Sequence, residues 1–134
     1  MMPISGISHI TLICKNLDKT TEFLQQIFSA KEIYASGNNT FSLSKEKFFK
    51  IGHLWLAIME GEPVSKTYNH IAFQVNVSDL STFREKISQL CLEILPDRKR
   101  HPDEGQSLYF YDYDGHLFEL HSGSLEKRLQ YYNK

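Results

Sequence analysis

Two stretches of the chain repeat the same order of hydrophobic and polar positions. One begins at Ile7 and reads ISHITLICKNLDKTTEFLQQIF, and the other begins at Tyr68 and reads YNHIAFQVNVSDLSTFREKISQL. In each, alternating hydrophobic positions are followed by a polar turn and then by hydrophobic positions at helical spacing. Both stretches therefore predict a strand, a turn and an amphipathic helix, with His9 and His70 at equivalent positions.

Each predicted helix has one hydrophobic face to bury. The first face holds Leu24, Ile27 and Phe28. The second face holds Leu80, Phe83, Ile87 and Leu90. We expect both faces to pack on the hydrophobic sides of the neighbouring strands.

Further segments are rich in aromatic and β-favouring residues and predict short strands. They are Phe41–Leu43, Leu54–Met59, Leu108–Tyr111 and Leu117–His121. The segment HLWLAIMEG, from His53, also corresponds to HLFELHSG, from His116. We predict an α+β fold of two βαβββ modules in a single domain. Module one covers residues 5–62, module two covers residues 67–123, and a C-terminal helix covers residues 124–133.

The residues from Asp112 to His116 are predicted to join the last two strands. Asp114 and Gly115 are typical of a hairpin, because glycine supplies the positive φ that tight turns require. The pattern D-x-D-G also opens calcium-binding loops, but the twelve-residue ligand pattern does not continue here. The sequence therefore favours a turn over a calcium site.

Strand alternation puts potential metal ligands on the less hydrophobic faces of their strands. His9 shares a face with Thr11, and Glu119 shares one with His121. His70 likewise points away from the strongly hydrophobic face of its strand. If the hydrophobic faces pack on the helices, the opposite faces line a cavity in which His9, His70 and Glu119 converge.

Two neutral imidazoles and one carboxylate form a ligand set suited to Mn, Fe, Zn or Ni. Three protein ligands leave positions open for water or substrate, which indicates a catalytic rather than a structural site. The counterpart of Glu119 in the first half is Trp55 or Leu56, so a symmetric fourth ligand is missing.

The other histidines near these strands have simpler interpretations. His53 and His116 precede equivalent strands, which favours a place in turns or on the surface. His121 follows Glu119 on the same face and is expected to orient that carboxylate by hydrogen bonding.

Composition and charge narrow the class of protein. The chain has 134 residues and a formal net charge of -1, with no basic surface predicted for nucleic acid. Cys14 and Cys91 form no CxxC pair and are interpreted as reduced thiols. The N-terminus lacks the features of a signal peptide, and no segment approaches the roughly 20 apolar residues of a membrane helix. We therefore expect a cytoplasmic protein that contacts neither nucleic acid nor membrane.

In its two βαβββ modules and its three candidate ligands on strands, the chain resembles the vicinal oxygen chelate superfamily. Within it, the chain is most similar to the fosfomycin resistance proteins. The likeness is carried by GISHITL at the start, TYNHIAF in the middle and SLYFYDYDGHLFELHSGSLEKRL at the end. The resemblance implies a glyoxalase-like fold, with a cupped mixed sheet around the metal site, and a homodimer.

The segment FSLSKEKFFKIGHLWLAIMEG looks like the hydrolase branch, FosX, which opens the epoxide of fosfomycin with water. The resemblance implies that His9, His70 and Glu119 bind Mn(II) and that Glu46 is the general base. From its polar surroundings alone, Glu46 would be interpreted as an exposed residue in a salt bridge. Positions that surround the phosphonate and oxirane in the family are matched by Thr11, Trp55, Tyr68, Lys99, Ser107, Tyr109 and Arg128.

The loop from Arg98 to Gln106 departs from the family's thiol transferases, which bind potassium nearby, so no potassium site is predicted. Arg98 and Arg100 could share phosphonate binding with Arg128.

The resulting hypothesis is a Mn(II)-dependent epoxide hydrolase that inactivates fosfomycin. One alternative is transfer of a thiol, such as glutathione or bacillithiol, to the same substrate. A second alternative is another reaction of the superfamily, such as that of a glyoxalase or an extradiol dioxygenase. A third is a drug-binding module without catalysis, against which the three ligands argue.

Overall fold

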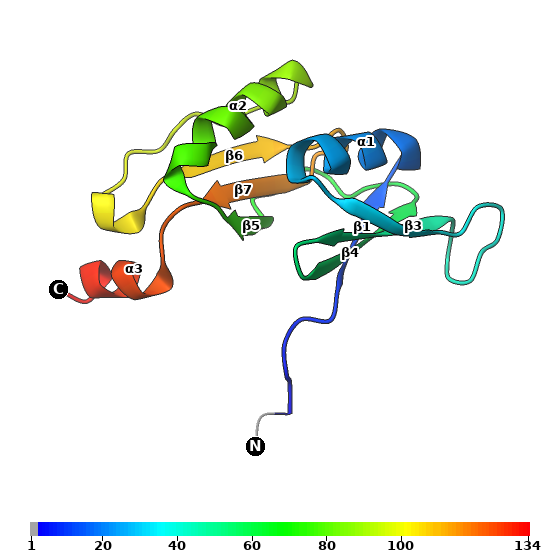
Figure 1. The fold of residues 1–134 in the computed structure, drawn as a ribbon, viewed down its shortest axis with the longest axis horizontal. Coiled ribbons are helices and arrows are strands. Elements are labelled where there is room, and N and C mark those ends of the chain that lie inside the picture. The colour runs from blue at the N-terminus through cyan, green and yellow to red at the C-terminus, as the bar shows by residue number, and fades with distance from the viewer. Residues whose placement is uncertain (1–2) are drawn as a thin grey trace. The chain divides into compact units, whose positions relative to one another are not determined.

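The structure is a computed structural model that describes residues 3–134. Within these residues the chain forms two compact units, which are divided between Val64 and Ser65. Each unit contains one sheet, and in each unit the first strand is followed by a helix and the sheet ends with an antiparallel pair of strands (Figure 1). The predicted α+β fold of two sheet modules is confirmed.

The first unit holds a four-stranded sheet in the order β1-β4-β3-β2. Strand β1 runs parallel to β4, and the other neighbouring strands are antiparallel. The elements in chain order are β1 (Ile10–Cys14), α1 (Leu17–Phe28), β2 (Lys31–Ala35), β3 (Glu46–Ile51) and β4 (Leu54–Glu60).

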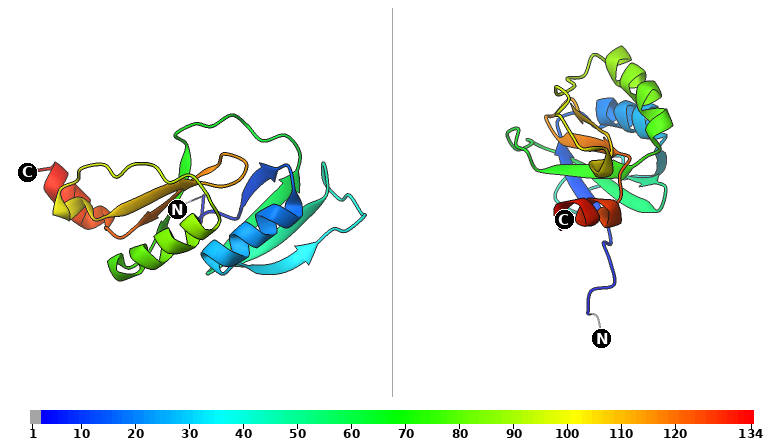
Figure 2. Two further views of the ribbon diagram at one scale, coloured as in Figure 1. Left: turned by 90° about the horizontal axis from the view of Figure 1, so that it is seen from above. Right: turned by 90° about the vertical axis from the view of Figure 1, so that its left-hand side faces the viewer.

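Helix α1 lies along one face of this sheet (Figures 1 and 2). It begins after Asn16, whose side chain accepts a hydrogen bond from the backbone N–H of Lys19 at 3.0 Å. Its buried residues are Thr20, Phe23, Leu24 and Ile27. The predicted face is confirmed at Leu24 and Ile27, whereas Phe23 is in the core and Phe28 is only half-buried.

The second unit holds a three-stranded sheet in the order β5-β7-β6, with β5 parallel and β6 antiparallel to β7. Helix α2 covers one face of this sheet and fully buries Ile87 (Figures 1 and 2). The elements in chain order are β5 (His70–Gln74), the 3₁₀ helix η1 (Val77–Asp79), α2 (Leu80–Gln89), the 3₁₀ helix η2 (Pro102–Glu104), β6 (Ser107–Tyr111), β7 (Leu117–His121) and α3 (Leu125–Tyr132).

The two units differ in the strand that follows the helix. In the second unit this strand is reduced to a single bridge between Ile94 and Phe110. In the first unit it is β2, which pairs with β3 through an irregular register between Glu32 and Tyr34. The hydrophobic pattern did not predict β2, because its residues do not alternate cleanly and most are exposed.

The predicted strand Phe41–Leu43 is wrong. These residues form bends, and the exposed fractions of Phe41 and Leu43 are 77% and 92%. The strand begins instead at Glu46, which pairs with Met59 of β4, and from Lys47 onward the strand also pairs with β2. Because a strand is stabilised by its partners, a short apolar segment without a neighbour does not form one.

The predicted connection between β6 and β7 is confirmed, with Gly115 at a φ of +85°. The carboxylate of Asp112 fixes this turn. Its Oδ1 accepts hydrogen bonds from the backbone N–H of Asp114 at 2.9 Å and of His116 at 2.8 Å. His116 and His53 both lie in turns, as expected.

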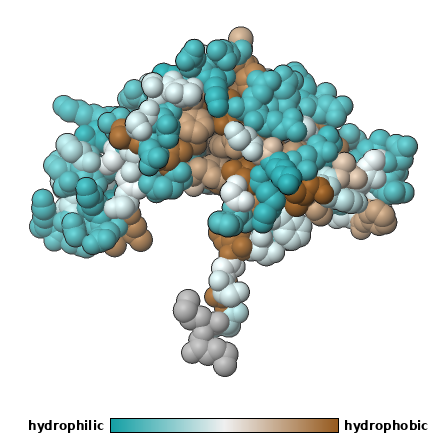
Figure 3. Space-filling view, in the orientation of Figure 1, coloured by the Kyte–Doolittle hydropathy of each residue, from teal (hydrophilic) through white to brown (hydrophobic). Residues whose placement is uncertain are grey.

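The outward surfaces of α1 and α2 are mainly hydrophilic, which matches their amphipathic sequences (Figure 3). Among residues 3–134, no helix combines the length and the hydrophobicity that crossing a membrane would require.

Candidate functional site

Two of the predicted metal ligands meet in the second unit. His70 Nε2 lies 3.0 Å from Glu119 Oε1. Strand β5 brings them together because it lies beside β7, where Ala72 pairs with Glu119. The side chain of Glu119 is only 7% exposed and that of His70 is 24% exposed.

The hydrogen bonds of His70 determine which of its nitrogens can bind a metal. Its Nδ1 lies 2.7 Å from the carbonyl oxygen of Tyr68, which can only accept, so Nδ1 carries the proton. Nε2, which lies beside the Glu119 carboxylate, is therefore the nitrogen left to bind a metal ion. Two ligand atoms 3.0 Å apart match neighbouring ligands of one cation, if bonds of about 2.1 Å meet at about a right angle. This donor set therefore fits a divalent metal ion.

Hydrogen bonds keep Glu119 ionised. Ser107 Oγ lies 2.6 Å from Glu119 Oε2, and His121 Nδ1 lies 3.3 Å from the same oxygen. Burial raises the pKa of Glu119, but the hydrogen bonds from Ser107 and Tyr109 and the nearby imidazoles outweigh it, and the pKa lies below its ordinary value. Glu119 is therefore an anionic ligand at neutral pH.

Aromatic rings surround the His70 imidazole. The ring centroids of Tyr68 and Tyr109 lie 5.0 Å and 5.4 Å from that of His70. Burial, a hydrogen bond with Tyr68 and the charge of Glu119 raise the pKa of Tyr109 to about 12. The Tyr109 hydroxyl therefore stays protonated, and it accepts a hydrogen bond from Arg100 Nη2 at 3.1 Å.

Arg128 reaches the same cluster from α3. Its Nη2 lies 3.2 Å from His121 Nε2 and 3.5 Å from the carbonyl oxygen of Glu104. Burial lowers the pKa of His121, Glu119 raises it, and Arg128 and Arg100 lower it again, so that it lies below its ordinary value. His121 thus contacts Glu119 from the side, as the sequence predicted, but its contact with Arg128 was not foreseen.

His9, in the first unit, lies against an aromatic ring. The centroids of His9 and Trp55 are 4.1 Å apart in a stacked arrangement, and Ser8 Oγ lies 3.0 Å from His9 Nδ1. Next along β1, Thr11 pairs with Ala57 and is exposed. The buried Leu56 belongs to the opposite, helix-covered face of β4, so His9 and Thr11 lie on the face away from α1.

Glu46 lies on that same face of the first sheet. Phe48, two residues further along β3, shares this face. The rings of Phe48 and Trp55 meet edge to face with centroids 5.1 Å apart. The interpretation of Glu46 as an exposed salt-bridging residue is wrong. Glu46 is 8% exposed, and within residues 3–134 its carboxylate forms no ion pair, whereas neighbouring Lys47 pairs with Glu32 at 3.1 Å.

The backbone of Glu46 explains its position. Its N–H donates to Ser36 Oγ at 3.0 Å, and its carbonyl accepts from the Ser36 N–H at 3.0 Å. These two bonds hold the first residue of β3 against the end of β2, so Glu46 enters the sheet instead of remaining in the polar loop.

The register also corrects the counterpart of Glu119. In the second sheet, Glu119 pairs with Ala72, which is two residues after His70. In the first sheet, the residue two after His9 is Thr11, and it pairs with Ala57. The counterpart is therefore Ala57, and the expectation of Trp55 or Leu56 is wrong. Alanine provides no metal ligand, so the first sheet has no carboxylate at the position that Glu119 occupies in the second.

Apart from Arg98 and Lys99, the sequence-predicted residues fall into two groups, one in each unit. In the loop before η2, Lys99 and Arg98 are exposed and lie apart from the hydrogen bonds around Glu119. The first unit carries His9, Thr11, Glu46 and Trp55. The second unit brings together Tyr68, His70, Arg100, Ser107, Tyr109, Glu119 and Arg128.

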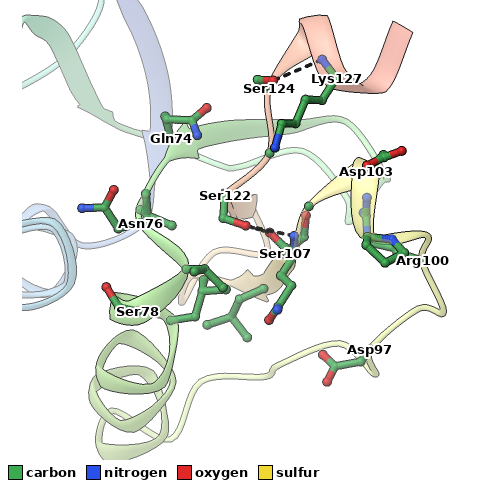
Figure 4. Close-up of a pocket in the computed structure, with 18 of the residues that line it drawn as sticks. Gln74, Asn76, Ser78, Asp97, Arg100, Asp103, Ser107, Ser122, Ser124 and Lys127 are labelled. Carbon is green, nitrogen blue, oxygen red and sulfur yellow. Dashed lines mark hydrogen bonds between the residues drawn. The ribbon is translucent and has the colours of Figure 1, made fainter. Parts of the chain in front are cut away.

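An open cavity of ≈ 1410 Å³ adjoins this second group (Figure 4). Its walls come from the β5–α2 connection, from the loop that includes Arg98 and Arg100, and from the β7–α3 connection. Ser107 lies in its wall, so the cavity reaches the residues that surround Glu119.

Asp112, Asp114 and His116 form another cluster of possible metal ligands. Both Asp112 oxygens are already engaged by the turn, since Oδ2 lies 2.7 Å from His116 Nδ1. Burial lowers the pKa of His116, but the hydrogen bond and charge of Asp112 outweigh it and raise the pKa. We interpret this cluster as the support of the hairpin.

Comparison with known proteins assigns the chain to a family. The profile of the glyoxalase/bleomycin resistance protein/dioxygenase superfamily matches residues 6–120. The chain is 61% identical over 132 residues to the fosfomycin resistance protein FosX of Listeria innocua. The aligned region covers 98% of this chain and 99% of that protein. The chain belongs to the FosX family of this superfamily.

A FosX crystal structure and a thiol transferase also match nearly the whole chain, at different identities. A crystal structure of Listeria monocytogenes FosX, a glutamate-to-glutamine variant with Mn(II) and 1S,2S-dihydroxypropylphosphonic acid, matches with a TM-score of 0.89 at 56% identity. The match covers 96% of this chain and 98% of that one. The metallothiol transferase FosB of Shouchella clausii is 35% identical over 137 residues, 98% of this chain and 89% of FosB.

Proposed function

We propose that this chain is a Mn(II)-dependent epoxide hydrolase that inactivates fosfomycin by adding water to its oxirane. The observation that carries the proposal is the approach of His70 Nε2 to Glu119 Oε1 at 3.0 Å, with the remaining polar atoms of both residues hydrogen-bonded. The membership of the FosX family, and the diol phosphonate bound to a FosX relative, support water as the nucleophile.

His70 and Glu119 would hold the metal together with His9, whose ring is supported by Trp55. The bound ion would supply Lewis acidity, which stabilises the negative charge that develops on the oxirane oxygen during ring opening. Tyr68 and Tyr109 pack around His70 and limit the directions in which its ring can turn.

Glu46 would act as the general base. As the oxygen of water bonds to an oxirane carbon, Glu46 takes up the proton of the water, and the bond between that carbon and the oxirane oxygen breaks. Proton uptake by the released oxygen then completes the diol. A carboxylate that is 8% exposed and forms no ion pair within residues 3–134 is suited to this role, because no cationic side chain occupies the oxygens that must accept the proton of water.

Buried donors without partners mark where the phosphonate and oxirane would bind. Within residues 3–134, Arg100 Nη1 and Trp55 Nε1 are buried and have no hydrogen-bond partner. Unsatisfied buried donors are costly, so both are expected to bond to a ligand. Arg100 Nη1 would meet the phosphonate, with Arg98, Lys99 and Arg128 adding positive charge, and Thr11, Ser107 and Tyr109 adding hydroxyl groups.

The residues assigned to the proposed site are divided between the two units, and we propose that the chain works as a homodimer. Mixing His9→Ala and His70→Ala chains tests whether one site uses residues of two copies. If it does, mixed dimers contain one intact site and recover activity; if each site lies within one chain, mixing restores nothing. Sedimentation measures the oligomeric state independently.

We also propose a cytoplasmic location. Within residues 3–134, Cys14 and Cys91 form no disulfide, as expected in a reducing compartment. Fractionation of cells followed by detection of the chain would test this proposal.

The decisive test of function is the product. Metal-loaded protein is incubated with fosfomycin, with and without glutathione or bacillithiol, and phosphorus NMR identifies what forms. A diol that forms without thiol supports hydrolysis. A product that requires thiol would replace our proposal with thiol transfer, and unchanged fosfomycin would favour a binding module.

A further inference from the structure

The polar groups behind Glu119 form a continuous chain of contacts that ends at α3. Arg128 Nη2 lies 3.2 Å from His121 Nε2, and His121 Nδ1 lies 2.6 Å from Ser107 Oγ. Ser107 Oγ in turn lies 2.6 Å from Glu119 Oε2. None of these four side chains is exposed.

We propose that Arg128 selects the tautomer of His121, and that His121 thereby fixes the Ser107 hydrogen bond that orients Glu119 for metal binding. Arg128, His121 and Ser107 are positioning residues in this proposal. It rests on the proposed metal site for its functional meaning, but the hydrogen-bond directions follow from this chain alone.

The direction of each bond follows from what its atoms can do. A guanidinium can only donate, so His121 Nε2 must accept from Arg128 and cannot carry a proton. The single proton of the neutral ring is then on Nδ1, which donates to Ser107 Oγ. Ser107 has one hydrogen, and it goes to Glu119 Oε2, because an ionised carboxylate can only accept.

The opposite tautomer leaves conflicts at both ends. A proton on His121 Nε2 would face the N–H of Arg128 across 3.2 Å, so that two donors oppose each other. An unprotonated Nδ1 would compete with Glu119 for the single hydrogen of Ser107. Either His121 Nδ1 or Glu119 Oε2 would then face a lone pair of Ser107 Oγ instead of its hydrogen. If Glu119 lost this hydrogen bond, its carboxylate could turn, and Oε1 would no longer be held toward His70.

This arrangement assigns Arg128 a role besides any contact with substrate. Arg128 also donates to the Glu104 carbonyl at 3.5 Å, and Glu104 accepts from Tyr132 Oη at 2.9 Å. These contacts tie the orientation of Glu119 to the packing of α3 on η2. A disturbance of α3 is therefore expected to reach the metal site through hydrogen bonds.

The first test reads the tautomer directly in metal-free protein. Nitrogen NMR of histidine-labelled chain, with the His121 signals identified by their loss in His121→Phe, distinguishes a protonated Nδ1 from a protonated Nε2. We expect the proton on Nδ1 in the parent and a shift of the population toward Nε2 in Arg128→Met. A parent with its proton on Nε2, or an unchanged tautomer in Arg128→Met, overturns the proposal.

The second test measures Mn(II) affinity by electron paramagnetic resonance. Loss of residues that orient metal ligands typically costs about 10- to 100-fold in affinity, and we expect this loss in Arg128→Met and His121→Phe. His121→Asn can keep a donor toward Ser107 and should retain more affinity than His121→Phe. Lys127→Met removes one charge from the same helix and is the matched control, expected to keep the parent affinity and tautomer.

The results separate this proposal from the proposed function. If Arg128→Met and His121→Phe fold, as circular dichroism would show, and bind Mn(II) like the parent, the positioning role is wrong even if fosfomycin is hydrolysed. If the parent fails to hydrolyse fosfomycin but the tautomer and affinity changes occur, the proposed function fails and the positioning role is supported.

Discussion

The imidazole of His9 stacks on the indole of Trp55, with ring centroids 4.1 Å apart and an interplanar angle of 29°. His9 is the last residue before β1, and its Nδ1 lies 3.0 Å from the hydroxyl of the adjacent Ser8, whereas Nδ1 of His70 faces the backbone carbonyl of Tyr68. Trp55 is on the neighbouring strand and is itself packed against Phe48. The aromatic contact therefore helps to hold His9, the proposed ligand in the first unit, in place.

We expect Trp55→Ala to weaken Mn(II) binding by roughly 2- to 10-fold, because an aromatic pair contributes about 0.5–1.5 kcal/mol. Trp55→Phe keeps a ring under His9 but removes the buried N–H, so Mn(II) affinity should stay near the parent value while the KM for fosfomycin rises. Metal titration and steady-state kinetics measure the two effects. Equal Mn(II) affinities in Trp55→Ala and the parent would remove Trp55 from this role.

The three proposed ligands should be separable from the other histidines. Alanine at His9, His70 or Glu119 is expected to remove most Mn(II) binding and activity without unfolding the chain. His53→Ala is the matched control, because His53 lies in the turn between β3 and β4. Elemental analysis of the purified variants measures metal content, and stoichiometric metal at parent affinity in all three would refute the ligand assignment.

Glu46→Gln preserves the shape of the side chain and removes its basicity. We expect hydrolysis to fall by about 10²- to 10⁴-fold, the usual contribution of a general base, while Mn(II) and fosfomycin still bind. A small thiol, which reaches its reactive thiolate more easily than water is deprotonated, should restore some ring opening as a thioether. Product analysis by phosphorus NMR checks both outcomes, and an undiminished rate of diol formation would place the base elsewhere.

Arg100→Met tests the binding of the phosphonate. Charge-assisted hydrogen bonds to a buried group contribute about 1.5–3 kcal/mol, so we expect the KM to rise roughly 10- to 100-fold with metal content unchanged. Arg84→Met is the control, because Arg84 lines the same cavity but is paired with Asp97 at 3.2 Å. A KM that rises equally in both variants would indicate a general effect of charge.

The stability of the metal-free protein should depend on pH through Glu119. Its pKa is lower in the folded chain than its ordinary value, so ionised Glu119 stabilises the fold above the unfolded-state pKa of about 4.3. This contribution is lost as the pH falls through the folded-state pKa. Glu119→Gln should therefore be less stable than the parent at neutral pH, and the difference should narrow on acidification. Thermal unfolding across this pH range measures the difference, and a pH-independent difference would contradict the assignment.

Local patterns in the sequence determined much of this molecule. Alternation along the strands placed His9 with Thr11 and Glu119 with His121, because the side-chain period of a strand is fixed by its backbone. The repeat predicted two modules, and the glycine in Asp114-Gly115 predicted the hairpin. The predicted FosX-type family was confirmed by comparison, since the matching segments span nearly the whole chain.

Tertiary structure decided the features that depend on pairing between distant segments. The register of β1 with β4 made Ala57 the counterpart of Glu119. Pairing with Met59 of β4 and hydrogen bonds with Ser36 placed Glu46 in a strand, where it is buried, and not in the polar loop. The contact between Arg128 and His121 depends on how α3 packs on η2. Sequence spacing fixes which face of its own element a residue occupies, but only packing between elements fixes which atoms of separate segments meet.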